Sequence, residues 1–269
     1  MTTLIFVFIF LFGTIIGSFL NVVIYRFNTG RTITRGRSIC MTCGRSLRWY
    51  ELIPVFSYLI QGGKCRRCSS KISKQYPLVE IGTGLIFVII SFKFLPVLFF
   101  SFLSYVFLVT LFVIIFSLLM VISVYDLRHK IIPEKLVYTF IAISFFSIFI
   151  NPSMFGPALG WPSLSSLISG PILALPFVLL WYFSKGYLMG LGDGKLILGI
   201  GWLLGLSSGL FSVILSFWIG SVVSIIIMIF SKKKIGMKTE IPFAPFLIMS
   251  TLVTFFFSFD IFSLIRLFS

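Results

Sequence analysis

"LIFVFIFLFGTIIGSFLNVV" (residues 4–23) decides the fold of this chain, because it is uncharged and long enough to cross a bilayer as one helix. No basic residue precedes this run, and no small-residue cleavage pattern follows it, so it does not have the form of a secretory signal. We therefore expect it to be retained as the first membrane span.

The composition extends this expectation to the whole chain. Hydrophobic residues make up 58% of the sequence and charged residues only 11%, which is too apolar for a water-soluble domain. The sequence thus predicts an all-α polytopic membrane protein with about eight transmembrane helices. Their predicted ranges are 3–25, 77–95, 98–124, 136–150, 164–184, 196–207, 209–230 and 243–265. We divide the chain into a first transmembrane helix (1–25), a polar loop (26–76) and a transmembrane domain (77–269).

The net charge of +15 is explained by membrane topology. With the amino terminus outside and the spans alternating, every Lys and Arg except Lys93 and Arg266 falls on the cytoplasmic side. This follows the positive-inside rule and places both termini outside. No nucleic-acid-binding motif surrounds the basic residues, so we expect no nucleic-acid partner. The uncharged, Pro- and Gly-containing segment 151–162 suits a short external turn.

All four cysteines lie in one cytoplasmic segment, "CMTCGRSLRWYELIPVFSYLIQGGKCRRC" (40–68). Two Cys-x2-Cys pairs, Cys40 with Cys43 and Cys65 with Cys68, supply four thiolates with the spacing of a tetrahedral zinc site. A closed set of four cysteine ligands favours a structural metal over a catalytic one. We therefore predict a small zinc-ribbon-like loop. The alternative is two incidental thiol pairs.

Two aspartates are the candidate catalytic groups. Asp126 lies in "VYDLRHKIIP" (124–133), after the third predicted span, and Asp193 lies in "GLGDGK" (190–195), ahead of the sixth. The topology puts both on the cytoplasmic face, where two carboxylates sharing a proton can hydrolyse a peptide bond. The alternative for each aspartate alone is a helix cap or a loop charge; it is reasonable for Asp193 and weaker for the pair, because both lie on one face. Glu51 and Glu80 have no evident partner in the sequence.

These motifs together resemble the type IV prepilin leader peptidases, which are related to the wider GxGD intramembrane aspartyl proteases. The resemblance also rests on "GSFLNVVIYR" (17–26), the cysteine pairs and "YPLVE" (76–80). Glu134 departs from the Asp or Asn expected after the Ile-Pro. The resemblance implies cleavage of the basic leader of prepilins or pseudopilins at the cytoplasmic face of the bacterial inner membrane, with Asp126 and Asp193 as the catalytic pair.

The resemblance further implies N-methylation of the new amino terminus by S-adenosylmethionine. No glycine fingerprint identifies the residues that bind this methyl donor. We also expect the basic loops to attract acidic membrane lipid or an acidic residue just past the cleavage point.

Three other readings remain open. They are a presenilin-like protease with different substrates, a proton-coupled transporter that uses the aspartates as a relay, and a non-enzymatic secretion assembly factor. The transporter reading is disfavoured because no repeated halves or midplane charges are visible. The assembly factor predicts that Asn substitutions at both aspartates leave function intact.

Overall fold

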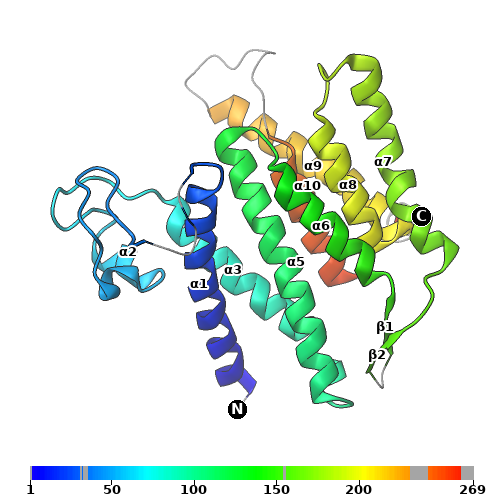
Figure 1. Ribbon diagram of the computed structural model, residues 1–269, viewed down its shortest axis with the longest axis horizontal. Helices are drawn as coiled ribbons and strands as arrows, with labels where there is room; N and C mark the ends of the chain where they lie inside the picture. The colour runs from blue at the N-terminus through cyan, green and yellow to red at the C-terminus, as the bar shows by residue number, and fades with distance from the viewer. Residues whose placement is uncertain (1, 31, 33–35, 154–155, 231–241, 262–269) are drawn as a thin grey trace. The chain divides into compact units, whose positions relative to one another are not determined.

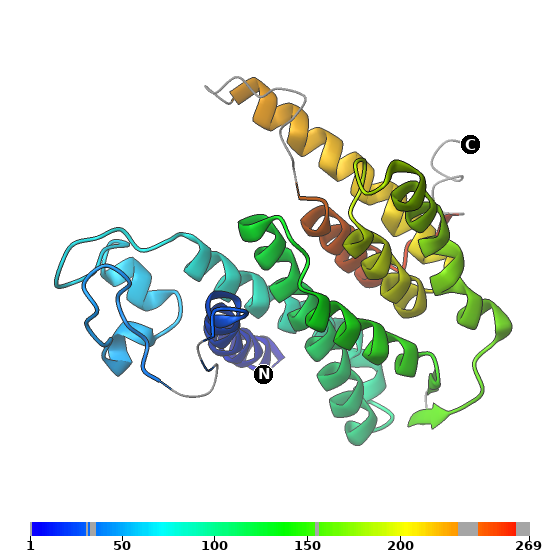
Figure 2. The ribbon, with the colours of Figure 1, turned by 45° about the horizontal axis from the view of Figure 1, so that its top comes forward.

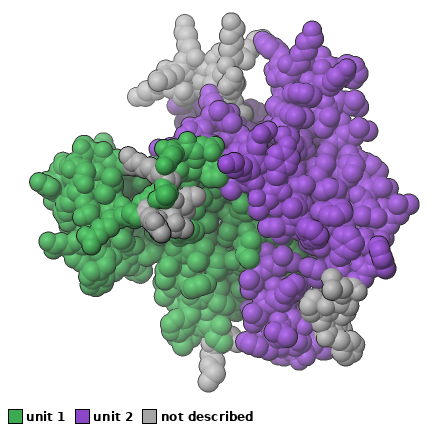
Figure 3. All heavy atoms as spheres, in the orientation of Figure 1, with its two compact units in different colours: residues 1–95, 112–121 green, residues 96–111, 122–269 purple. Residues whose placement is uncertain are grey.

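The computed structural model describes residues 2–30, 32, 36–153, 156–230 and 242–261. The described residues are mainly helical, with one short hairpin and a largely irregular polar loop, and the chain forms two compact units (Figure 3). Unit 1 comprises residues 1–95 and 112–121, and unit 2 comprises residues 96–111 and 122–269. The domain division expected from the sequence stays a prediction.

Unit 1 is built on two helices that pack along one another, α1 (Thr2–Arg26) and α3 (Gln75–Lys93) (Figure 1). Between them the chain forms the polar loop with the short helices η1 (Trp49–Leu52) and α2 (Phe56–Ile60). Glycine permits the close approach of α1 and α3, since a Cβ added at Gly17 would lie 2.7 Å from the Glu80 Cα. Small residues at such crossings are typical of membrane helices.

Unit 2 holds most of the remaining helices. Its elements in chain order, with those that extend into unit 1, are α4 (Leu95–Leu98), α5 (Phe102–His129), α6 (Glu134–Ser147), β1 (Ile150–Ser153), β2 (Gly156–Leu159), α7 (Leu164–Ser184), α8 (Leu191–Leu204), α9 (Leu206–Phe230) and α10 (Ala244–Phe257). Helix α8 packs against α6, α7, α9 and α10 (Figure 2). The first turn of α8, which carries Asp193, is thus held by several neighbouring helices.

Small residues also set the crossing of α7 and α8. A Cβ added at Gly201 would lie 2.7 Å from the Gly170 Cα, and the Ser169 hydroxyl donates a hydrogen bond of 2.8 Å to the Gly201 carbonyl. An apolar surround offers no water to satisfy these groups, so the bond between the helices is favourable there. Pro171 and Pro176 lie inside α7.

The eight predicted segments correspond to eight apolar helices, but the number of membrane spans is not confirmed as eight. Among the described residues, five helices are long and apolar enough to cross a membrane: α1, α3, α5, α7 and α9. Helices α6, α8 and α10 have 14 residues each, or about 21 Å of length, which is short of a bilayer core. The chain is therefore a multi-pass membrane protein with at least five candidate spans in the described part.

Two local expectations are corrected. Asp126 does not follow its helix, because α5 continues to His129, and Asp193 lies within the first turn of α8. Polar residues at a helix end mislead a hydropathy reading, since the backbone hydrogen bonds continue past the apolar run. The segment 151–162, expected to be a short turn, contributes to an antiparallel hairpin, β1 with β2, in which Ile150 pairs with Leu159. Its prolines disfavour helix and favour extended backbone.

Candidate active site and metal centre

Asp126 is a buried carboxylate near the C-terminal end of α5. Asp126 is only 5% exposed. The backbone N–H of Ala244 donates a hydrogen bond to its carboxylate. Ala244 is the first residue of α10, so the partly positive end of that helix faces the carboxylate. The helix α5 ends three residues later, where Lys130 adopts a left-handed conformation.

Asp193 lies at the N-terminal end of a helix, in the first turn of α8 after the N-cap residue Gly190. Burial and, to a lesser extent, the negative charge of Asp126 raise the pKa of the Asp193 carboxyl to about 7. The electrostatic effect of Asp126 on Asp193 shows that the structure brings the two predicted residues near one another. Two carboxyls in this arrangement can share one proton.

Contacts between the flanking motifs fix this arrangement. A Cβ added at Gly192 would lie 3.0 Å from the Ile132 Cβ, so the loop before α6 packs directly on the first turn of α8. The Lys195 ammonium lies 2.8 Å from the Glu134 carboxylate and 4.7 Å from the centre of the Tyr138 ring. Glu134, which stands where the family resemblance predicts Asp or Asn, thus links α6 to α8.

The sequence analysis did not identify Ala244 as a member of the site. Its contribution is a backbone N–H, and no side-chain pattern reveals such a donor. A weak signal was present in "PFAP" (242–245), because proline in the first turn marks a helix start. The pairing of that helix end with Asp126 depends on the fold.

The four cysteines meet in unit 1 as a cluster. The sulfur atoms of Cys40, Cys43, Cys65 and Cys68 all lie within 4.8 Å of one another, and those of Cys40 and Cys68 are 3.8 Å apart. A tetrahedral zinc site with Zn–S bonds of about 2.3 Å separates its sulfurs by roughly 3.8 Å. The cluster therefore fits a zinc ion.

The two halves of the cluster share one backbone conformation. The residue four positions after the first cysteine donates its N–H to that cysteine's carbonyl at 2.9 Å, from Gly44 to Cys40 and from Ser69 to Cys65. Both donors have left-handed backbone angles, with φ of 68° at Gly44 and 55° at Ser69. This repeated turn directs each pair of sulfurs to one point, which is what a shared metal requires.

The electrostatics of the thiols agree with metal binding. Backbone N–H groups, that of Cys43 first, lower the pKa of Cys40 to about 6, and the Ser70 hydroxyl lowers the pKa of Cys68. The pKa of Cys43 is raised to about 11 despite the Arg45 backbone, since burial and the neighbouring sulfurs oppose its ionisation. A bound zinc would displace the remaining proton.

The structure gives partners to two acids that had none in the sequence. The Glu51 carboxylate lies 2.9 Å from the Arg45 guanidinium and accepts the Arg48 N–H at 2.8 Å. The Glu80 carboxylate, in α3, accepts the Val55 N–H at 2.7 Å. Both glutamates are buried and anchor the polar loop, Glu51 within itself and Glu80 to the helix.

Two family descriptions match the chain in succession. Residues 11–94 match the Bacterial Peptidase A24 N-terminal domain, and residues 113–225 match the Type IV leader peptidase family. The first range contains the cysteine cluster and the second contains both aspartates. No solved structure matches the chain.

Curated relatives match over most of the sequence. The "Prepilin leader peptidase/N-methyltransferase" of Vibrio cholerae is 30% identical over 255 residues, which cover 90% of this chain and 92% of that protein. The protein of the same name from Bacillus subtilis is 27% identical and covers 95% of both chains. A shorter match, 52% identical over 81 residues, covers 30% of this chain and 24% of the namesake from Myxococcus xanthus.

Proposed function

The chain belongs to the type IV leader peptidase family, and we propose that it is a membrane aspartic endopeptidase that cleaves prepilin leaders and N-methylates the new amino terminus. We further propose Asp126 and Asp193 as the catalytic pair. One observation carries this assignment: Asp126 acts electrostatically on Asp193, although 66 intervening residues separate them in the sequence. In this chain, which has seven acidic residues, such a pairing in an apolar surround is costly without a function.

The environments of the two carboxyls suggest different roles. Asp193 holds the shared proton, since its pKa is about 7. Asp126, which accepts the Ala244 N–H, carries the negative charge and acts as the base. The proton is a property of the pair, and it returns to the pair at the end of each cycle.

Peptide hydrolysis by this pair proceeds in two steps. In the first, Asp126 takes a proton from water, the water oxygen bonds to the scissile carbonyl carbon, and Asp193 donates its proton to the carbonyl oxygen. In the second, Asp126 gives its proton to the leaving nitrogen as the C–N bond breaks, and a hydroxyl of the tetrahedral intermediate returns a proton to Asp193. The products are the leader with a free carboxyl group and the mature chain with a free amine.

The substrate class follows from the family and agrees with the charges of this chain. We infer that the substrates are prepilins or pseudopilins, whose basic leader meets the cytoplasmic face and whose mature part is an apolar helix. The positive-inside pattern supports an active site on the cytoplasmic side of the bacterial inner membrane. The basic loops contribute attraction to acidic lipid headgroups.

We assign zinc a structural role. Four cysteine ligands close the coordination sphere and leave no position for a substrate. The zinc would hold the loop 26–76, which is too polar to form a core of its own. The methyl transfer requires S-adenosylmethionine, which supplies an electrophilic methyl group when bound.

The test is incubation of the purified chain with a prepilin and methyl donor, followed by mass measurement of the product's amino terminus. The wild type is expected to release the leader and to add one methyl group. Asp126→Asn is expected to abolish cleavage, whereas Asp260→Asn, the same change at the third aspartate of the chain, should leave cleavage intact. Cleavage by Asp126→Asn would favour an assembly factor contaminated by another protease.

A second substrate tests the specificity. An unrelated single-span membrane protein should remain uncut under conditions that process the prepilin completely. Equal cleavage of both would assign the chain to the presenilin-like proteases and would refute the prepilin specificity.

A further inference from the structure

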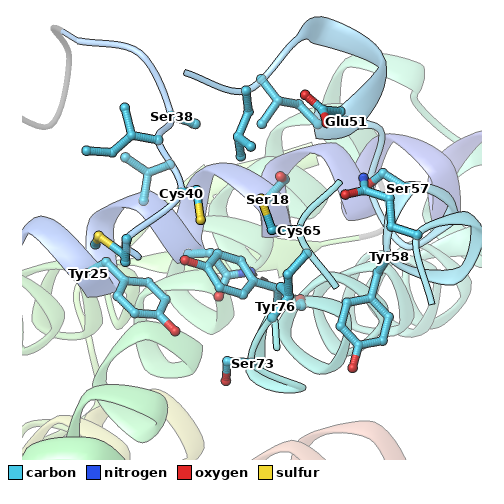
Figure 4. A pocket seen from close by; sticks show the side chains of 18 of the residues that line it. Ser18, Tyr25, Ser38, Cys40, Glu51, Ser57, Tyr58, Cys65, Ser73 and Tyr76 are labelled. Carbon is cyan, nitrogen blue, oxygen red and sulfur yellow. Dashed lines mark hydrogen bonds between the residues drawn. The ribbon is translucent and has the colours of Figure 1, made fainter. Parts of the chain in front are cut away.

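A cavity lies in unit 1 beside the cysteine cluster. Its volume is about 350 Å3, which is within the range of small-molecule binding sites. The lining residues all fall between positions 18 and 80, so they come from α1, the polar loop and the start of α3 (Figure 4). The proposed cleavage chemistry uses none of these residues.

Two helix faces form one wall of the cavity. Ser18, Asn21 and Tyr25 recur every three or four positions and share one face of α1, while Tyr76 and Glu80 lie one turn apart on α3. The close approach of the backbones at Gly17 brings these faces together. The sequence stretches 17–26 and 76–80, which have no part in the aspartate chemistry, thus meet at this cavity.

Asn21 lines the cavity and connects the two helices that form this wall. The residue is 1% exposed, and its Nδ2 donates to the carbonyls of Tyr76 at 3.2 Å and Gly17 at 3.3 Å. Its Oδ1 is buried and has no hydrogen-bond partner among the described residues. Asn21 therefore fixes the two helix faces relative to one another, and its buried Oδ1 is not open to the cavity.

Glu80 adds a buried negative charge. The residue is 6% exposed, and the Val55 N–H at 2.7 Å occupies one of its carboxylate oxygens. The Ser18 hydroxyl is a second donor to this carboxylate, which can accept about four hydrogen bonds, so capacity remains for a ligand. A buried carboxylate favours hydroxyl donors and cations and opposes phosphate groups.

Aromatic rings supply a flat apolar surface. The rings of Tyr25 and Tyr76 are stacked, with centroids 5.0 Å apart and an angle of 9° between their planes. Tyr58 lines another part of the cavity, and Figure 4 shows it on the side away from Tyr25 and Cys40. Tyrosine faces bind both planar bases and cationic groups.

We propose that this cavity is the binding site for S-adenosylmethionine, a statement that rests on the proposed N-methylation. The donor combines a planar base, ribose hydroxyls, an ammonium group and a sulfonium cation. The tyrosines match the base and the sulfonium, and Glu80 matches the hydroxyls or the ammonium. The cysteine cluster forms part of the wall, since Cys40 and Cys65 line the cavity.

The experiment measures equilibrium binding of radiolabelled S-adenosylmethionine to the zinc-loaded full chain in detergent, alongside prepilin cleavage. Glu80→Gln keeps the acceptor for Val55 and removes the charge, so donor binding should weaken about tenfold or more while cleavage remains. Asp126→Asn should give the reverse result. Tyr25→Leu should also weaken donor binding, whereas Tyr187→Leu, at a residue 90% exposed and outside the cavity, should not.

Photocrosslinking locates the bound donor without relying on a variant. Ultraviolet irradiation of the wild-type complex should label peptides within residues 18–80. Labelling confined to residues 122–230 would overturn the proposal, as would unchanged donor binding in both Glu80→Gln and Tyr25→Leu. If Glu80→Gln no longer bound a pilin peptide without its leader but still bound the donor, the cavity would be assigned to the peptide. That result would also overturn the proposal.

The outcome for the wild type separates this proposal from the proposed function. A wild-type chain that cleaves prepilin and does not bind the donor would refute the donor site and leave the peptidase assignment standing. A chain that binds the donor at residues 18–80 and does not cleave would support the donor site and refute the peptidase assignment.

Discussion

Replacement of Asp193 by Asn should abolish cleavage and stabilise the protein at alkaline pH. The pKa of this carboxyl is about 7 in the folded chain, compared with an ordinary value of 3.8. The difference of about 3 corresponds to roughly 4 kcal/mol against ionisation. Asn has nearly the same shape and no charge, so the variant avoids this cost.

The pH range follows from the direction of the change. Between about pH 4 and pH 7 the unfolded chain loses the Asp193 proton and the folded chain keeps it, so wild-type stability decreases as pH rises. Asp193→Asn lacks this dependence. Its advantage over the wild type should grow from near zero below about pH 4 to at most roughly 4 kcal/mol above pH 7.

The assay is thermal unfolding in detergent at pH 5 and pH 8, combined with prepilin cleavage. Asp193→Asn should unfold several degrees above the wild type at pH 8 and show a smaller difference at pH 5. Asp260→Asn serves as the matched control for the same substitution elsewhere in the chain and should still cleave the prepilin. The role assigned to Asp193 would be refuted if the wild type and Asp193→Asn had equal unfolding temperatures at both pH values. It would also be refuted if Asp193→Asn still cleaved the prepilin.

Three further outcomes are expected. Metal analysis should find about one zinc per chain, and Cys68→Ser should reduce it and loosen the loop while membrane insertion persists; full zinc content in that variant would refute the four-thiolate site. Gly44→Ala should lower the free energy of unfolding by about 1 kcal/mol, because φ is 68° at this residue. Ser69→Gly, at the equivalent turn, should be neutral or stabilising. Equal effects of the two variants in thermal unfolding would contradict the repeated backbone conformation. Lys195→Met should lower stability by no more than about 1 kcal/mol, since its partner Glu134 is largely exposed, and a larger loss in the same assay would show that the pair is more than a surface contact.

The sequence predicted candidate residues for the metal site and for the catalytic pair. Cys-x2-Cys spacing identified Cys40, Cys43, Cys65 and Cys68 as one cluster, because two residues between thiols is a local geometric requirement for a shared metal. Asp126 and Asp193 were recognisable because a carboxylate at the end of an apolar run is costly wherever the chain folds. Their roles as a catalytic pair remain predictions that the variants above test.

The sequence was less reliable at helix ends. Hydropathy ended the third span before Asp126 and began the sixth after Asp193, whereas both residues lie inside helices. Hydropathy measures transfer to lipid, and backbone hydrogen bonding continues into polar residues. The same limitation leaves the number of spans open, since α6, α8 and α10 are helical but shorter than a bilayer core.

What the sequence by itself determined is a helical membrane chain, a four-thiolate cluster and two candidate acids, because apolar length, cysteine spacing and charge cost are properties of short segments. The tertiary structure alone decided that the Ala244 N–H meets Asp126, that Glu134 pairs with Lys195, and that α1 and α3 enclose a cavity beside the cysteines. These contacts join segments tens of residues apart. They arise from helix packing around glycine and from hydrogen bonds to backbone groups. Every residue except proline has a backbone N–H donor, so no pattern of side chains predicts which one is used.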